Sequence, residues 1–226
     1  MKKLLVSFAI LLIGIAASAR TEQDTVSQAA RKWYAGLNAG VQVYSGMTDK
    51  YLPFKETLAP VGGASFGRYL NDWLSIDLNL AAAQFKGLYT RPAGEKHFTT
   101  DDCFDLNAQR YYQKGAYIHC YARAGIDLNT LIAGYKEDRK TAFVPYVGGG
   151  VATGLGKTFT DAENFAFAPT IDYGLEFLIR FCPDITGIID IHNSAVGLQL
   201  DNEGCTEHAF HASFGAEFGV RFNLGK

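Results

Sequence analysis

Two residues toward the C-terminal end have the types and spacing of a base and a nucleophile. His192 and Ser194 stand two positions apart in a segment, 185–195, that we expect to be a β-strand. Side chains two apart on a strand share one face, so the imidazole of His192 would lie near enough to take the proton of the Ser194 hydroxyl. The same pair more often fills the polar rim of a sheet than performs chemistry, and the residues alone leave both interpretations open.

Charged side chains recur on the polar face of the expected strands, opposite the apolar face. They are Asp77, Arg123, Asp127, Asp172, Glu176, Arg180, Asp190, Glu217 and Arg221. An eight-stranded barrel encloses a space that side chains just fill, so opposite charges there should pair and plug the lumen. The alternative is a gated, ion-conducting network that breaks and re-forms.

The strands that would position these residues are clearest in the closing segment, 210–224. Apolar side chains alternate there with polar or glycine residues over all fifteen positions, which indicates a long, two-faced β-strand. The polar face mixes the small Ser213 and Gly219 with the large Glu217 and Arg221. A narrow barrel interior needs such a mixture, whereas a face exposed to water gains nothing from glycine. The phenylalanine face is therefore expected to contact lipid.

The N-terminus has the features of a secretory signal peptide. Residues 1–19 combine a basic start, a short apolar run over 4–16 and small residues at the end, with cleavage expected after Ala19. The apolar run is too short for a transmembrane helix. We expect a short periplasmic segment over 20–32, followed by one domain over 33–226 that can enter the outer membrane only as a closed β-barrel.

Seven further strands precede the closing one. Their expected ranges are 33–45, 61–70, 74–85, 117–128, 143–155, 166–181 and 185–195. The net charge of −2 suggests no nucleic-acid partner, and 24 Gly against 6 Pro with 13% aromatic residues fits a β-rich chain. The predicted fold class is all-β, an eight-stranded antiparallel transmembrane β-barrel.

The connections between these strands indicate an orientation. One end has long loops over 46–60, 86–116 and 196–209 and a shorter one over 156–165, whereas the other end has tight turns over 71–73 and 182–184, with 129–142 as an exception. Bacterial barrels place their short turns in the periplasm and their long loops outside the cell. Any binding specificity should lie in those loops, above all in 87–115, which contains Lys96, His97, Asp101, Asp102 and Arg110.

The chain contains four cysteines, and export would place them in an oxidising compartment. Cys103 and Cys205 fall in long loops, so we expect a disulfide between them in an oxidising compartment. Cys120 is a rival partner for either, and Cys182, at the opposite rim, is expected to be free. The spacing of cysteines and histidines suggests no metal site.

Three segments resemble a known family. Residues 125–136 (GIDLNTLIAGYK), 143–151 (FVPYVGGGV) and 218–225 (FGVRFNLG) are similar to the barrel of OmpA-like outer-membrane proteins, particularly the Bacteroides type. The resemblance covers about 33–225 and implies an eight-stranded outer-membrane barrel without a cofactor. The sequence departs from full-length members, which carry a peptidoglycan-binding domain, so we do not expect wall anchoring through such a domain.

A second, local resemblance concerns the possible catalytic pair. The stretch 191–204 is similar to the active-site region of lipid A deacylases of the PagL type, in which a His base and a Ser nucleophile act with a downstream acid. The resemblance implies these roles for His192 and Ser194, with Glu207 as the acid. The match departs at Ala195, where the family has Asn, and at the acid position, which is occupied by Thr206.

Three functions follow. The first is a monomeric, non-enzymatic outer-membrane barrel in contact with lipid, which has a structural or surface-interaction role with an extracellular ligand at its loops, and weak pore formation as a minor activity. The second is a lipid A esterase that uses His192, Ser194 and Glu207. The third is a soluble periplasmic carrier barrel with an apolar interior.

Overall fold

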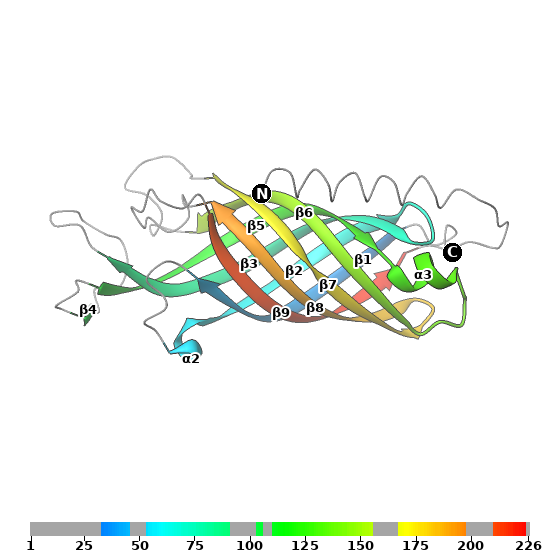
Figure 1. The fold of residues 1–226 in the computed structure, drawn as a ribbon, viewed down its shortest axis with the longest axis horizontal. Coiled ribbons are helices and arrows are strands. Elements are labelled where there is room, and N and C mark those ends of the chain that lie inside the picture. Colours follow the sequence, from blue (N-terminus) through cyan, green and yellow to red (C-terminus); the bar gives the residue numbers. More distant parts are fainter. Residues whose placement is uncertain are drawn as a thin grey trace.

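Eight long strands form a closed antiparallel barrel (Figure 1). The computed structural model describes residues 33–45, 53–90, 103–105, 110–155, 167–197 and 210–224. The strands follow the order β3-β2-β1-β9-β8-β7-β6-β5, and β3 pairs with β5 to close the barrel. They are β1 (Trp33–Ser45), β2 (Leu58–Tyr69), β3 (Leu74–Thr90), β5 (Arg110–Ile126), β6 (Thr141–Leu155), β7 (Phe167–Cys182), β8 (Ile185–Gly197) and β9 (Phe210–Asn223). The predicted fold class is confirmed.

The largest departure from the sequence prediction is in the segment 86–116, which we expected to be a loop. β3 continues to Thr90 and β5 begins at Arg110, and a short strand, β4 (Cys103–Asp105), pairs with the start of β5. The prediction failed because few residues there alternate in polarity. Alternation requires two different environments on the two faces, which a segment projecting beyond a membrane does not have.

This projecting part is a two-stranded ribbon. β2 pairs with β3 only as far as Ala83, and β6 pairs with β5 only from Ala116. Six further pairs, from Phe85↔Gly115 to Thr90↔Arg110, join β3 to β5 without β2 or β6, and only the short β4 pairs beside them, with Arg110 and Tyr111. At about 3.3 Å per residue the six pairs span about 20 Å. Phe85 at their inner end is still buried in the barrel, and the outer pairs project at the end that carries β4 (Figure 1).

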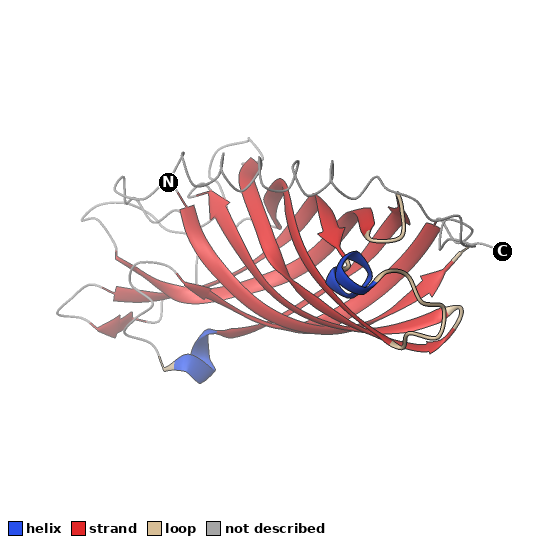
Figure 2. Cartoon of the chain, turned by 45° about the vertical axis from the view of Figure 1, so that its right-hand side comes forward, coloured by secondary structure: helices blue, strands red, loops and turns tan. Residues whose placement is uncertain are grey.

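Two short helices lie at opposite ends of the barrel (Figure 2). At the loop end, α2 (Phe54–Thr57) precedes β2, and at the turn end α3 (Leu128–Ala133) follows β5. The α3 helix begins at Asp127, whose side chain accepts a hydrogen bond from the Thr130 amide, and it ends at Gly134, whose φ of 70° suits glycine. Neither helix, nor any other in the described ranges, is long and apolar enough to cross a membrane.

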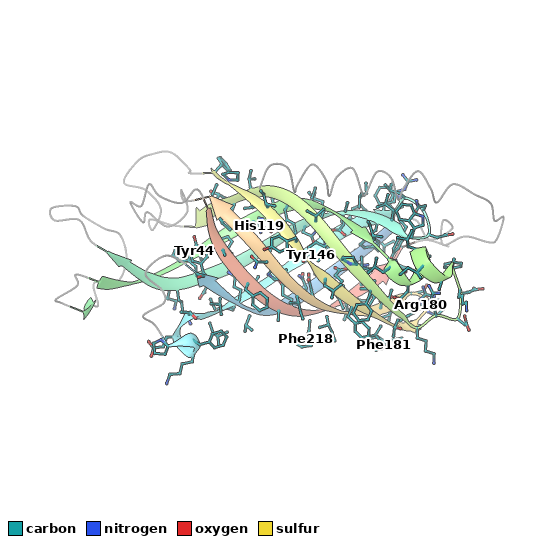
Figure 3. All side chains as sticks on the ribbon, in the orientation of Figure 1. Tyr44, His119, Tyr146, Arg180, Phe181 and Phe218 are labelled. Carbon is teal, nitrogen blue, oxygen red and sulfur yellow. The ribbon has the colours of Figure 1, made fainter. Side chains whose placement is uncertain are left out.

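The two faces of the barrel wall have opposite polarity. Leu37 and Phe218 point outward with 61% and 67% of their surface exposed, whereas Asp172 and Arg221 point inward with 2% and 1% exposed. Figure 3 shows Phe218 and Phe181 outside the ribbon and Tyr146 and His119 within it. A soluble carrier would need the reverse arrangement, an apolar interior and a polar exterior, so that alternative is wrong.

The interior is layered along the barrel axis. Aromatic and aliphatic side chains fill the loop end, among them Tyr44, Phe85, Tyr117 and Val196. Charged and hydrogen-bonding side chains fill the middle, and a smaller apolar cluster of Val144, Leu178 and Ile188 lies toward the turn end. The barrel therefore has a filled core rather than a channel.

Candidate functional site in the barrel interior

Arg123 is the centre of the interior network. Its Nε lies 2.6 Å from Asp77 Oδ1, its Nη2 lies 2.5 Å from Glu176 Oε1, and its Nη1 lies 3.3 Å from Asp190 Oδ2. The guanidinium also lies 4.4 Å from the centre of the Tyr146 ring, which is a cation–π distance. One cation thus contacts three carboxylates that belong to three different strands.

Arg221 provides a second centre beside the first. Its Nη2 donates to Glu176 Oε2 at 2.8 Å, and its guanidinium lies 4.2 Å from the centre of the Tyr34 ring. The Tyr34 hydroxyl donates to Asp77 at 2.7 Å. Because Glu176 and Asp77 each contact both halves, the two arginine centres form one connected network.

Strand register explains why these charges meet. Asp77 stands opposite Arg123 on the neighbouring strand, and Glu176, Asp190 and Glu217 stand side by side on β7, β8 and β9. Like charges directly opposite one another are destabilising unless they are compensated. Arg123 and Arg221 supply that compensation on one side of the row, and the Asn38 amide donates to Glu217 on the other.

A second polar cluster surrounds Asp172. His119 Nε2 lies 3.3 Å from Asp172 Oδ2 and 2.8 Å from the Thr170 hydroxyl, which itself donates to Asp172 at 3.1 Å. The Ser194 hydroxyl also donates to Asp172. Three neighbours thus satisfy one buried carboxylate, as buried polar groups require.

The two members of the alternative catalytic pair contact different carboxylates. Ser194 donates its proton to Asp172, while His192 Nδ1 lies 3.6 Å from Glu217 Oε1, and no hydrogen bond joins His192 to Ser194 within the described ranges. Ser194 is 6% exposed and faces the interior, away from the outer face that lipid would contact. Glu207 lies outside the described residues.

Seven of the nine predicted network residues lie buried in the interior, and two do not. Asp127 lies at the turn end, where it caps α3 by accepting from the Thr130 amide and hydroxyl. Arg180 lies at the same rim, where it donates to the Glu137 carbonyl at 3.0 Å, and Figure 3 places it at that end. The interior prediction was wrong for both because each strand reaches the rim there, so alternation no longer decides what the side chain faces.

The sequence analysis placed Ser213 on the interior face but did not assign the neutral side chains to the network. Gln42 contacts Tyr117 and Ser213 near the loop end, and Tyr34 and Tyr146 hydrogen-bond to carboxylates. All five occupy inward positions of their strands, so their alternation with apolar neighbours was the available signal. Aromatic residues did not indicate which face of a strand points into the barrel, because they occur on both faces.

The structure describes some of the four cysteines and not others. Cys120 and Cys182 are free thiols, the second of them exposed. For Cys103 the structure describes the backbone in β4 but not the side chain, and Cys205 lies outside the described residues, so the predicted disulfide stays a prediction. Within the described ranges no group of three His, Cys, Asp or Glu is placed to hold a metal ion.

The space left between the two polar clusters is small. A cavity of about 10 Å³, bordered by Tyr117, His119, Asp172 and Glu217, separates the two polar clusters. One water-sized group needs about as much space. The network can therefore brace the wall and exclude solutes, but it has no room for a substrate.

Comparisons with known proteins agree with this architecture. A family model described as "Outer membrane protein beta-barrel domain" matches residues 7–226. The crystal structure of Neisserial surface protein A is similar with a TM-score of 0.50 at 11% identity, covering 85% of this chain and 97% of that one. The N-terminal barrel of Pseudomonas aeruginosa OprF (TM-score 0.36, 14% identity, 84% and 97% covered) and Yersinia pestis Ail in a bilayer nanodisc (0.40, 12%, 84% and 99%) are also similar. None of the curated protein sequences compared with the chain matches it.

Proposed function

Because the chain belongs to the outer membrane protein beta-barrel domain family, we propose that it is a closed outer-membrane anchor that presents a β-ribbon and loops for surface interaction. The observation that carries this proposal is the extension of β3 and β5 six residue pairs beyond their barrel neighbours. A barrel that served only to span the membrane would not need the extension.

The outer wall supplies the membrane anchor. Large apolar side chains such as Leu37, Leu80, Phe214 and Phe218 are each more than half exposed around the wall. An exposed apolar band of this kind suits the hydrocarbon core of a bilayer. We propose that outer-membrane lipid is the partner of this surface and that the protein is a monomer, which closure of the barrel within one chain permits.

The filled interior argues for presentation rather than transport. The Arg123 network and the aromatic cluster at the loop end occupy the lumen in successive layers. Any ion conductance would require these contacts to break, so pore formation is a minor activity. No catalytic step is included, because the arrangement around Ser194 does not supply an activated nucleophile.

The orientation follows from the connections. The tight turns and α3 lie at one end of the barrel and the ribbon at the other, so the turn end faces the periplasm and the ribbon faces outward. The sequence of the projecting hairpin is rich in tyrosine and basic residues, with Tyr89, Tyr111, Tyr112, Arg110 and Lys114. Tyrosine and arginine are enriched in protein-binding surfaces. Export would use the signal peptide, with Arg20 as the first mature residue.

The experiment compares the wild-type barrel in lipid nanodiscs with a variant in which residues 87–114 are replaced by a two-residue Asn-Gly turn. Both are applied to arrays of extracellular proteins and glycans. The proposal expects binding by the wild type that the variant loses, while both barrels keep β-sheet circular dichroism and resist unfolding in detergent. A control with only 156–165 replaced by a turn should bind like the wild type. Binding that persists without the ribbon, or no binding by the wild type, would refute the surface-interaction role.

A further inference from the structure

We propose that the outer wall of the barrel binds the phosphate of a membrane phospholipid at Arg68, on β2 near the turn end. The inference rests on the proposed membrane anchorage. It does not depend on binding by the ribbon, which lies at the opposite end of the barrel.

Arg68 is a charged residue on a face that is otherwise uncharged. Residues of β2 alternate in burial, with Ser65 and Gly67 buried and Phe66 exposed, so Arg68 belongs to the outward set. At the described outward positions between the ribbon and the turns, every other side chain of the eight long strands is uncharged. A charge on a lipid-facing wall is costly unless it reaches the headgroup region and finds a partner there.

The height of Arg68 on the wall corresponds to the edge of a bilayer. From Leu58, where β2 begins at the loop end, the strand takes ten residue steps to Arg68. At about 3.3 Å per step and a strand tilt of about 40°, this is about 25 Å along the barrel axis. The apolar band of such barrels is about 25 Å tall and is flanked by aromatic residues, and Trp33 stands opposite Arg68 in register. Arg68 therefore lies at the level of the lipid phosphates.

The Arg68 guanidinium has an aromatic neighbour and no acceptor. Its Cζ lies 5.3 Å from the centre of the Trp33 ring, which stacks on Phe66 with 5.2 Å between the ring centres. Its Nε is buried without an acceptor among the described residues, whereas neither terminal nitrogen is buried in this way. No hydrogen bond or ion pair joins Arg68 to another described residue. The terminal N–H groups thus remain available at the outer surface, where a phosphate would accept from both as from a fork.

The wall next to Arg68 suits an acyl chain. Toward the loop end, the outward side chains of β2 become small at Ala64 and Gly62. Leu37 on β1 and Leu80 on β3 stand opposite Ala64 in register, and they are 61% and 56% exposed, so they project on either side of it. A lipid chain that continues from a phosphate at Arg68 would lie against this strip. A free phosphate would gain nothing from the strip, so the site is assigned to a phospholipid.

The fluorescence of Trp33 tests the inference, because the indole lies beside Arg68. The chain contains two tryptophans, so Trp73→Phe leaves Trp33 as the single reporter. The barrel is folded in dodecyl maltoside micelles, which contain no phosphate, and is titrated with phosphatidylglycerol brominated in its acyl chains near the glycerol. Bromine quenches an indole that it contacts. We expect saturable quenching of Trp33 by this lipid.

Variants at Arg68 make the outcome specific to the site. Arg68→Gln should weaken the apparent affinity about tenfold, since it removes charge-assisted hydrogen bonds to the phosphate. Arg68→Lys keeps the charge but not the fork, so its affinity should lie between the two. Lys114→Gln, which removes the same charge from an exposed position in the ribbon, should leave the affinity unchanged. β-sheet circular dichroism checks that each variant is folded.

Two phosphate controls complete the test. Diacylglycerol with the same brominated chains should bind weakly, and equally to the wild type and Arg68→Gln. Equal affinity of the wild type, Arg68→Gln and Arg68→Lys for phosphatidylglycerol would overturn the inference. Reversal of the quenching by an equal concentration of inorganic phosphate would also overturn it, because the site would then bind the free anion. Neither result would remove the proposed membrane anchorage, which the apolar wall as a whole provides.

Discussion

Arg123 on β5 and Glu176 on β7 form an ion pair inside the barrel with Nη2 2.5 Å from Oε1, although β6 lies between their strands. Such a contact joins parts of the wall that backbone hydrogen bonds do not join directly. Together with Tyr34, Asp77, Tyr146, Asp190 and Arg221 it brings side chains of seven of the eight long strands into one network. Backbone hydrogen bonds between neighbouring strands and side-chain contacts across the interior thus both stabilise the closed barrel.

Removing the central cation should destabilise the folded barrel. Arg123→Met leaves Asp77, Glu176 and Asp190 buried with less compensating charge, and breaking a buried network in this way costs about 3–5 kcal/mol. Urea unfolding of the barrel in lipid vesicles measures the change. Lys114→Met, an exposed position on the same strand, should alter the free energy of unfolding by less than about 0.5 kcal/mol. Equal stability of the two variants would show that the network is not structural.

Two adjacent glycines of β6 should differ in their response to alanine. A Cβ at the inward-facing Gly150 would meet the backbone of Cys120 and Tyr121, whereas at the outward-facing Gly149 it would meet only the Thr170 carbonyl at 3.3 Å. Gly150→Ala should therefore destabilise the barrel by about 1–3 kcal/mol, as overpacking does, while Gly149→Ala should be nearly neutral. The same urea titration compares them, and a larger loss for Gly149→Ala would contradict the assigned facing.

These glycines also show where the sequence is informative and where it is not. Strands with clear alternation, such as β1 and β9, were predicted to within a residue, because membrane and interior impose opposite demands on their two faces. The run Gly148-Gly149-Gly150 has no side chains to alternate, so its facing could be read only from the register with β5.

For the interior site, sequence alone could name the charges but not their partners. Asp77 and Arg123 are 46 residues apart, and their meeting depends on register. The sequence also could not separate Asp127 and Arg180 from the buried set, because the last residues of a strand alternate like the others while their surroundings change from lumen to solvent.

Ser194→Ala should leave lipid A unchanged. The hydroxyl donates to Asp172 rather than to His192, so its loss removes one hydrogen bond to a carboxylate and not a nucleophile. Mass spectrometry of lipid A from cells producing the wild type or the variant provides the readout. Release of an acyl chain that depends on Ser194 would restore the esterase interpretation.

Cys182 should report the orientation of the barrel. It is an exposed thiol beside the tight turn between β7 and β8, at the end that we assign to the periplasm. A membrane-impermeant maleimide should leave it unlabelled on intact cells and label it once the outer membrane is permeabilised, with labelled peptides identified by mass spectrometry. A cysteine introduced by Lys86→Cys in the ribbon should react on intact cells, and the opposite pattern would invert the orientation.

Single-channel recording of the wild-type barrel in a planar bilayer tests most directly whether the interior network closes the lumen. The wild type should show no sustained conductance steps, because the charged middle layer and the aromatic layer at the loop end both fill the space. A variant carrying Arg123→Ala, Glu176→Ala and Tyr117→Ala removes large side chains from both layers, so its lumen should conduct ions. Its current should favour cations, since Asp77, Asp190 and Glu217 remain in the lumen. Sustained conductance by the wild type equal to that of the variant would contradict a lumen that is closed to ions.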